Sequence, residues 1–196
     1  MRRIFSITVA LMILLSLTTS VQALESKTLQ RDNGGSAWAS WSKTNGTLIT
    51  DTYLSLSQSS DGTDIYLSTN TWDTTTGFTV DSKSGYLFTN DDVFTIDSKL
   101  NFASLSEVSI NVYNWYDWYT PEIETLKITA DWVGTGEVQK GSSTYTSTDG
   151  DYRFKSTSNS NYRNAMASGS VNNIDLGQNN GGSLYKFKSA FIEMEK

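Results

Sequence analysis

The sequence predicts an all-β fold, in the form of a mostly antiparallel β-sandwich that makes up a single domain. Short runs of alternating apolar and polar residues recur between clusters of Gly, Asn, Asp and Ser, which is typical of half-buried strands joined by tight turns. Sustained helical periodicity is missing after the N-terminal segment, and proline occurs once. Many short strands at regular spacing favour a sandwich over a solenoid.

Strand alternation is clearest in the two segments on either side of residues 113–122. Successive residues of a strand point to opposite faces, so a run in which every second residue is apolar has one inward face. We expect the inward faces to consist of Val108, Ile110 and Val112 in the first strand, and of Leu126, Ile128, Ala130 and Trp132 in the second. Near the C-terminus, Tyr185 and Phe187 alternate with Lys186 and Lys188.

Short clusters of turn-forming residues separate the alternating runs. Gly and Asn accept the backbone conformations that tight turns require, and Asp side chains bond to nearby backbone groups. The best-defined hairpin turn is Asp149–Gly150, between two Ser/Thr-rich runs. The predicted turns are 44–46, 60–62, 83–85, 90–92 and 148–150.

One hexapeptide occurs twice with a single change. Residues 78–83 are FTVDSK and residues 94–99 are FTIDSK, so five of six positions match. A repeat architecture needs at least about three copies. We therefore expect two similar strands of one sheet that pack the same face.

The first 23 residues resemble an export signal. Two arginines precede an apolar run over 4–17, and small residues occupy positions 21 and 23. This run is shorter than the ~20 residues of a membrane-spanning helix. We expect cleavage after Ala23, secretion to the extracellular space or cell surface, and no stable membrane span afterwards. Residues 24–35 should form a loosely held lead-in, and residues 36–196 the domain.

Composition excludes several classes of function. Removing residues 1–23 takes two of the 15 basic residues and none of the 21 acidic ones, leaving 13 against 21. Such an acidic chain is a poor partner for nucleic acid, whose phosphates are bound by clusters of Lys and Arg. His and Cys are both absent, which removes the common transition-metal ligands and the His-dependent nucleophiles. We expect no cofactor, no metal site and no catalytic residue.

The segment 111–121 (NVYNWYDWYTP) holds the candidate ligand site. Extending the inward parity of the preceding strand makes both faces aromatic where the strand reaches its turn, so some rings should stay exposed. Tyr and Trp suit such positions because each joins a large apolar face to a polar handle. Flat rings beside amide and carboxylate groups suit sugar rings, and equally a protein partner. The predicted ligand-binding residues are Asn114, Trp115, Tyr116, Asp117, Trp118 and Tyr119.

These observations favour a noncatalytic binding module for carbohydrate or a cell-surface polymer. A structural or adhesive cell-envelope protein that contacts other proteins is the first alternative. A glycan-active enzyme is a further alternative, because Glu122 and Glu124 point to one face of a strand, with Asp117 close by in the chain. Glycoside hydrolysis requires two carboxylates at a defined separation. Detecting hydrolysis of a bound glycan would separate the enzyme from the module.

Overall fold

The computed structural model describes residues 27–114 and 123–195, and in these residues it contains strands and no helix. The prediction of an all-β, antiparallel fold is therefore confirmed. No helix in the described part of the chain has the length and hydropathy of a membrane span. The strands are β1 (Lys27–Asn45), β2 (Leu48–Gln58), β3 (Thr63–Asp73), β4 (Thr79–Thr89), β5 (Phe94–Ile96), β6 (Phe102–Asn114), β7 (Ile123–Asp149), β8 (Tyr152–Val171) and β9 (Ile174–Glu195).

All nine strands belong to one hydrogen-bonded sheet in the order β4-β3-β2-β1-β9-β8-β7-β6-β5. A further pairing joins β4 to β6, where Gly85 lies opposite Val112 and Lys83 lies opposite Asn114. This pairing joins the first strand of that order, β4, to the last but one, β6. The sandwich arrangement expected from the sequence is not confirmed, because all nine strands belong to one hydrogen-bonded sheet rather than to two separate ones.

The chain divides into two compact units, which we describe separately. The larger unit comprises Arg31–Thr144 and Thr157–Ala190, and the described part of the smaller unit comprises 27–30, 145–156 and 191–195. In the smaller unit, Phe154 stacks between Tyr152 and Phe191, with ring centroids 6.4 and 5.9 Å apart. Residues 27–35, expected as a lead-in, form the first part of β1.

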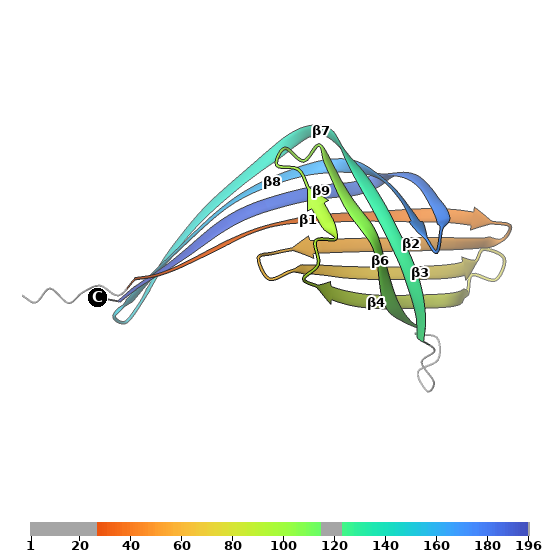
Figure 1. Ribbon diagram of the computed structural model, residues 1–196, viewed down its shortest axis with the longest axis horizontal. Helices are drawn as coiled ribbons and strands as arrows, with labels where there is room; N and C mark the ends of the chain where they lie inside the picture. The colour runs from red at the N-terminus through yellow and green to blue at the C-terminus, as the bar shows by residue number, and fades with distance from the viewer. Residues whose placement is uncertain (1–26, 115–122, 196) are drawn as a thin grey trace, which may run out of the picture. The chain divides into compact units, whose positions relative to one another are not determined.

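The core of the larger unit is built mainly from the inward faces of β1–β3 and of β6–β7, with Phe94 of β5 and small contributions from β8 and β9. Figure 1 shows β6 and β7 crossing over β2, β3 and β4. Trp132 is fully buried at the centre of the core. The ring of Phe94 meets Trp132 edge-on at 6.3 Å, and the indole Nε1–H of Trp132 donates to the carbonyl oxygen of Trp38 at 3.1 Å. A buried indole thus keeps a hydrogen-bond partner.

The predicted inward faces of β6 and β7 are confirmed. Val108 pairs with Ile128 and Ile110 pairs with Leu126 in the antiparallel register. The exposed fraction does not exceed 7% for any of the seven predicted residues, which are Val108, Ile110, Val112, Leu126, Ile128, Ala130 and Trp132.

Four of the five predicted turns join strands, and the fifth is wrong. The hairpin at Asp149–Gly150 links β7 to β8, and Gly150 has a φ of 54°. The turn predicted at 83–85 instead lies inside β4, where Gly85 pairs with both Leu67 and Val112. A Cβ atom at Gly85 would lie 2.3 Å from the carbonyl oxygen of Asn111. This glycine therefore permits close approach of two strands rather than a change of direction.

Candidate functional site

Most of the aromatic site predicted at 114–119 lies outside the described residues. Asn114 is described: it ends β6 opposite Lys83, and its side-chain N–H donates to a carboxylate oxygen of Asp81 at 3.3 Å. Its amide is therefore engaged within the sheet. The other five residues remain a prediction, and they are Trp115, Tyr116, Asp117, Trp118 and Tyr119.

A second group of exposed aromatic residues lies across the outer face of β1 to β4. This aromatic strip consists of Trp38 in β1, Tyr53 in β2, Tyr66 in β3 and Tyr86 in β4. Each ring alternates with inward residues of its own strand, as Tyr53 does with the buried Leu54. Because side chains alternate between the two faces of a strand, a buried neighbour places the ring on the outside.

Strand register brings the four rings into one row. Tyr66 lies directly opposite Tyr86, while Trp38, Tyr53 and Tyr66 follow one another on diagonal positions of neighbouring strands. The ring centroids of Trp38 and Tyr53 are 6.3 Å apart with planes 29° apart, and those of Tyr53 and Tyr66 are 6.2 Å apart with planes 59° apart. The phenolic O–H of Tyr86 donates to Asp64. The planes of Trp38, Tyr53 and Tyr66 are therefore not coplanar.

The strip presents apolar surface to solvent, and its neighbouring outward positions are polar apart from Phe88. The exposed fractions are 38% for Trp38 and Tyr53, 41% for Tyr66 and 60% for Tyr86. The outward positions two residues before and after each ring contain neither Lys nor Arg. They are Ser36, Ser40, Asp51, Ser55, Asp64, Ser68, Ser84 and Phe88.

This arrangement has the chemistry of a binding surface for an uncharged polar chain. Aromatic rings offer flat apolar faces, against which the C–H groups of a sugar ring can pack. Hydroxyl and carboxylate groups beside the rings can bond to sugar hydroxyls.

Sequence reasoning missed the strip although its signal was present. In β3 the sequence Ile65-Tyr66-Leu67 places a ring between two apolar residues that share one face of the strand. Once Ile65 and Leu67 are assigned to the core, Tyr66 must face outward. The rings nevertheless lie in four separate segments of the chain, and only the register between strands shows that they form a row.

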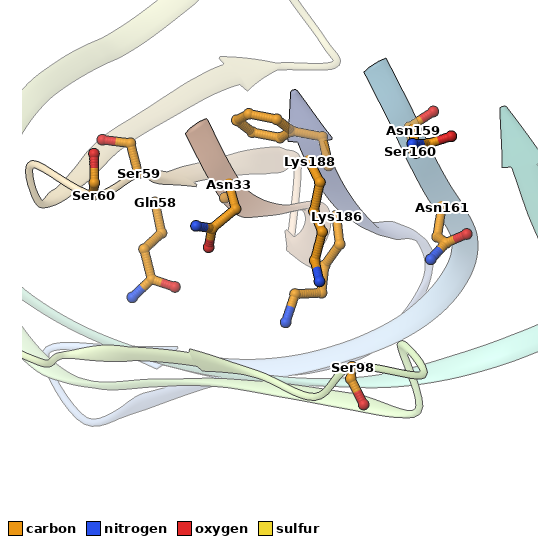
Figure 2. Close-up of a pocket in the computed structure, with 12 residues that line it drawn as sticks. Asn33, Gln58, Ser59, Ser60, Ser98, Asn159, Ser160, Asn161, Lys186 and Lys188 are labelled. Atoms are coloured by element: carbon orange, nitrogen blue, oxygen red, sulfur yellow. The ribbon is translucent and has the colours of Figure 1, made fainter. Parts of the chain in front are cut away.

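A polar pocket of about 600 Å³ lies at one end of the larger unit. Its walls come from β1, β2, β8, β9, the connection after β2 and the connection after β5. Figure 2 shows the side chains of Lys186 and Lys188 between Asn33 and Gln58 on one side and Asn161 on the other. Nothing in the sequence pattern had indicated this pocket.

The carboxylates of the enzyme alternative are only partly described. Glu122 lies outside the described residues, whereas Glu124 in β7 accepts a hydrogen bond from the Lys83 ammonium at 2.6 Å. Lys83 also lies 3.3 Å from Asp81. The hydrogen bond to Glu124 is the main reason that the pKa of Lys83 is raised, and burial opposes it. Glu124 thus has a structural role as an ion-pair partner in the described residues.

Comparisons with known proteins add no relative. No family model, no curated protein and no solved structure matches the chain. Within the described residues, no group of three or more acidic side chains is arranged to hold a metal ion.

Proposed function

We propose that this protein is a noncatalytic binding module for a chain of neutral sugars in an extracellular or cell-surface polymer. The observation that carries the proposal is the aromatic strip of Trp38, Tyr53, Tyr66 and Tyr86, a row of exposed rings with no Lys or Arg two residues before or after any ring. Exposed contiguous apolar surface rimmed by polar groups commonly marks an interaction site.

The ring geometry favours a single flexible chain over a crystalline surface. A flat crystal face would require coplanar rings, but neighbouring planes in the strip differ by 29° and 59°. A single glycan chain can rotate about its glycosidic bonds and so contact successive rings whose planes differ. Soluble or amorphous polysaccharide is therefore the expected ligand.

The test begins with a screen of the mature protein against a glycan array and neutral soluble polysaccharides, with hydrolysis of each bound glycan measured. A Tyr53→Ala/Tyr66→Ala double variant should weaken binding about tenfold or more, because truncating a central aromatic contact costs about 2 kcal/mol or more. Tyr145→Ala removes a tyrosine that is 65% exposed in the smaller unit and serves as the matched control. Undiminished binding by the double variant would overturn the proposal.

A Trp115→Ala/Trp118→Ala variant tests the site predicted from the sequence. If this variant loses glycan binding while the strip variant keeps it, the ligand is held at 114–119 instead. If the mature protein binds no glycan and the strip variant loses contact with cell-envelope proteins, the adhesive alternative replaces the glycan module. Exposed Tyr and Trp residues are also typical anchors of protein interfaces.

Export is part of the proposal. Cleavage after Ala23 would leave Leu24 as the N-terminus of the secreted protein. Intact-mass measurement of the secreted form should show that residues 1–23 are missing. A mature form that retains Met1 would contradict this step.

A further inference from the structure

We propose that the polar pocket beside β9 is a second binding site, for a sugar-sized polyol that carries an oxyanion. A volume of about 600 Å³ lies within the range of roughly 300–1,000 Å³ that is typical of small-molecule sites. The inference is independent of the aromatic strip, because none of the four strip residues lines this pocket.

The walls of the pocket are rich in groups that both donate and accept hydrogen bonds. A carboxamide offers two donors and one acceptor oxygen, and a hydroxyl offers one of each, so such groups match the hydroxyls of a polyol. Four lining residues carry carboxamides: Asn33, Gln58, Asn159 and Asn161. Four more carry hydroxyls: Ser59, Ser60, Ser98 and Ser160.

Part of this wall is fixed in place before any ligand binds. The side-chain N–H of Gln58 donates to the carbonyl oxygen of Phe94 at 3.1 Å. The Lys186 ammonium donates to the carbonyl oxygen of Ile96 at 3.2 Å. Groups that are already held lose less conformational entropy on binding.

The charge of the pocket is opposite to that of the chain. The whole sequence carries a formal charge of −6, yet the pocket is lined by Lys186 and Lys188 and by no carboxylate. Among the described residues, the lysines in ion pairs are Lys83 and Lys127. The two pocket lysines therefore lack a carboxylate partner there, and a concave site focuses their field toward an anion.

One aromatic residue also lines the pocket. Phe187 lines it and stacks on Tyr185, with centroids 6.1 Å apart. A Cβ atom at Gly34 would lie 2.8 Å from the Phe187 ring, so the glycine lets the ring pack against the backbone of β1. Because Phe187 alternates with Lys186 and Lys188 along β9, its ring lies on the opposite face of the strand from the two ammonium groups. The lysines, amides and hydroxyls therefore carry the recognition of the ligand.

Two properties together indicate the ligand. Amides and hydroxyls alone would accept a neutral sugar, and lysines alone would accept any small anion. Their combination fits a carboxylated or phosphorylated sugar. Either source of the oxyanion would satisfy the lysines, which act as point charges rather than as shaped forks.

The experiment compares four probes by isothermal titration and NMR: glucuronate, glucose 6-phosphate, glucose and inorganic phosphate. We expect one of the two anionic sugars to bind at least about tenfold more tightly than both glucose and phosphate, equivalent to about 1.4 kcal/mol. The stronger of the two identifies the oxyanion. Equal binding of glucose overturns the role of the lysines, and equal binding of phosphate overturns the role of the polyol.

Two variants locate the site. Lys188→Gln removes one pocket charge, and Asn159→Asp adds an opposing one without changing side-chain size. Both should reduce binding of the anionic sugar severalfold or more, with unchanged thermal unfolding. Asn164→Asp introduces the same charge on an exposed part of β8 outside the pocket and is the matched control. Normal binding by both pocket variants would refute the proposal.

The same proteins separate this site from the proposed function. The Tyr53→Ala/Tyr66→Ala variant should bind the anionic sugar normally while it loses the polymer. Lys188→Gln should show the reverse pattern. If Tyr53→Ala/Tyr66→Ala instead abolishes binding of the anionic sugar, the ligand lies on the strip and the pocket is not a second site.

Discussion

Two nearly identical hexapeptides, 78–83 and 94–99, have different structures in this protein. Phe78 lies in the connection before β4 with an exposed fraction of 71%, whereas Phe94 begins β5 and is fully buried. We expected from the sequence two similar strands of one sheet that pack the same face. Both segments do contribute to strands of one sheet, β4 and β5, but the expectation of the same packed face is wrong. Identical residues therefore contribute differently to stability in the two places.

The two aspartates differ as much as the phenylalanines do. Asp97 accepts backbone N–H groups from Lys99, Asn101 and Phe102 and so organises a tight turn. Asp81 lies within β4 and approaches the ammonium group of Lys83 at 3.3 Å. One carboxylate shapes the backbone, and the other joins an ion pair with a lysine of its own strand.

The residues that follow each hexapeptide account for the difference. Ser84 and Gly85 continue an alternating run, which pairs with β3 along its length. After Lys99 the chain instead turns at Leu100, which is buried with a φ of 58°. Arg163 from β8 holds this turn through the Leu100 carbonyl and the Asn101 side chain. Context decides which of two structures the same six residues adopt.

Truncating the two phenylalanines should give the largest contrast. Phe94→Ala removes the ring that meets Trp132 in the core and should lower the free energy of unfolding by about 3–5 kcal/mol. Phe78→Ala should change it by less than about 0.5 kcal/mol, because its side chain is mostly exposed. Denaturant unfolding of both variants measures the difference. Equal losses would show that the two segments pack alike after all.

Replacing Gly85 tests whether the residues after the first hexapeptide keep it in a strand. Gly85→Ala places a methyl group against the backbone of Asn111, and we expect a loss of about 1–3 kcal/mol through overpacking. Gly77→Ala is the control: no atom lies within 4 Å of its added methyl group, although its φ of 72° carries a backbone strain of about 1 kcal/mol. A smaller loss at Gly85 than at Gly77 would contradict close strand approach as the reason for this glycine.

Removing Asp97 should have an effect that depends on pH. Burial alone would raise the pKa of Asp97, but hydrogen bonds from three backbone N–H groups outweigh it and lower the pKa below 3.8. The stabilisation is thus present above the unfolded-state pKa and is lost as pH falls through the folded one. Asp97→Ala should cost about 1–2 kcal/mol at pH 7.

The control for this variant is Phe94→Leu, whose loss comes from packing. Unfolding of both variants is measured at pH 7 and at a pH near 3. The deficit of Asp97→Ala should shrink in acid, while that of Phe94→Leu should stay constant. A deficit of Asp97→Ala that is the same at both pH values would mean that the carboxylate charge does not support the turn.

Sequence patterns predicted the parts of the fold that depend on neighbouring residues. Alternation placed Val108 and Trp132 in the core, and the Asp149–Gly150 pair located a hairpin. Patterns failed where a residue's role depends on a segment far away in the sequence. Gly85 is an example, because its role comes from the close approach of a second strand at Asn111. The aromatic strip and the polar pocket could not be predicted for the same reason, since the pairing of distant strands assembles them.

The smallest contrast is expected between the two lysines. Lys83 donates to Glu124 at 2.6 Å and approaches Asp81 at 3.3 Å, and its pKa is raised above 10.5 by these partners. Near neutral pH its charge therefore stabilises the fold, and this contribution is lost as pH rises through the higher folded pKa.

Lys83→Gln should lower the free energy of unfolding by about 0.2–1 kcal/mol at pH 7, because the pair is partly exposed to solvent. Lys99→Gln should change it by less, since the turn uses the backbone N–H of Lys99 rather than its side chain. Unfolding at low and high salt distinguishes the two: screening should reduce the loss at Lys83 toward that at Lys99. A loss at Lys83 that persists in high salt would assign its role to packing of the side-chain stem between β4 and β7, so that Asp81 and Glu124 would contribute little through charge.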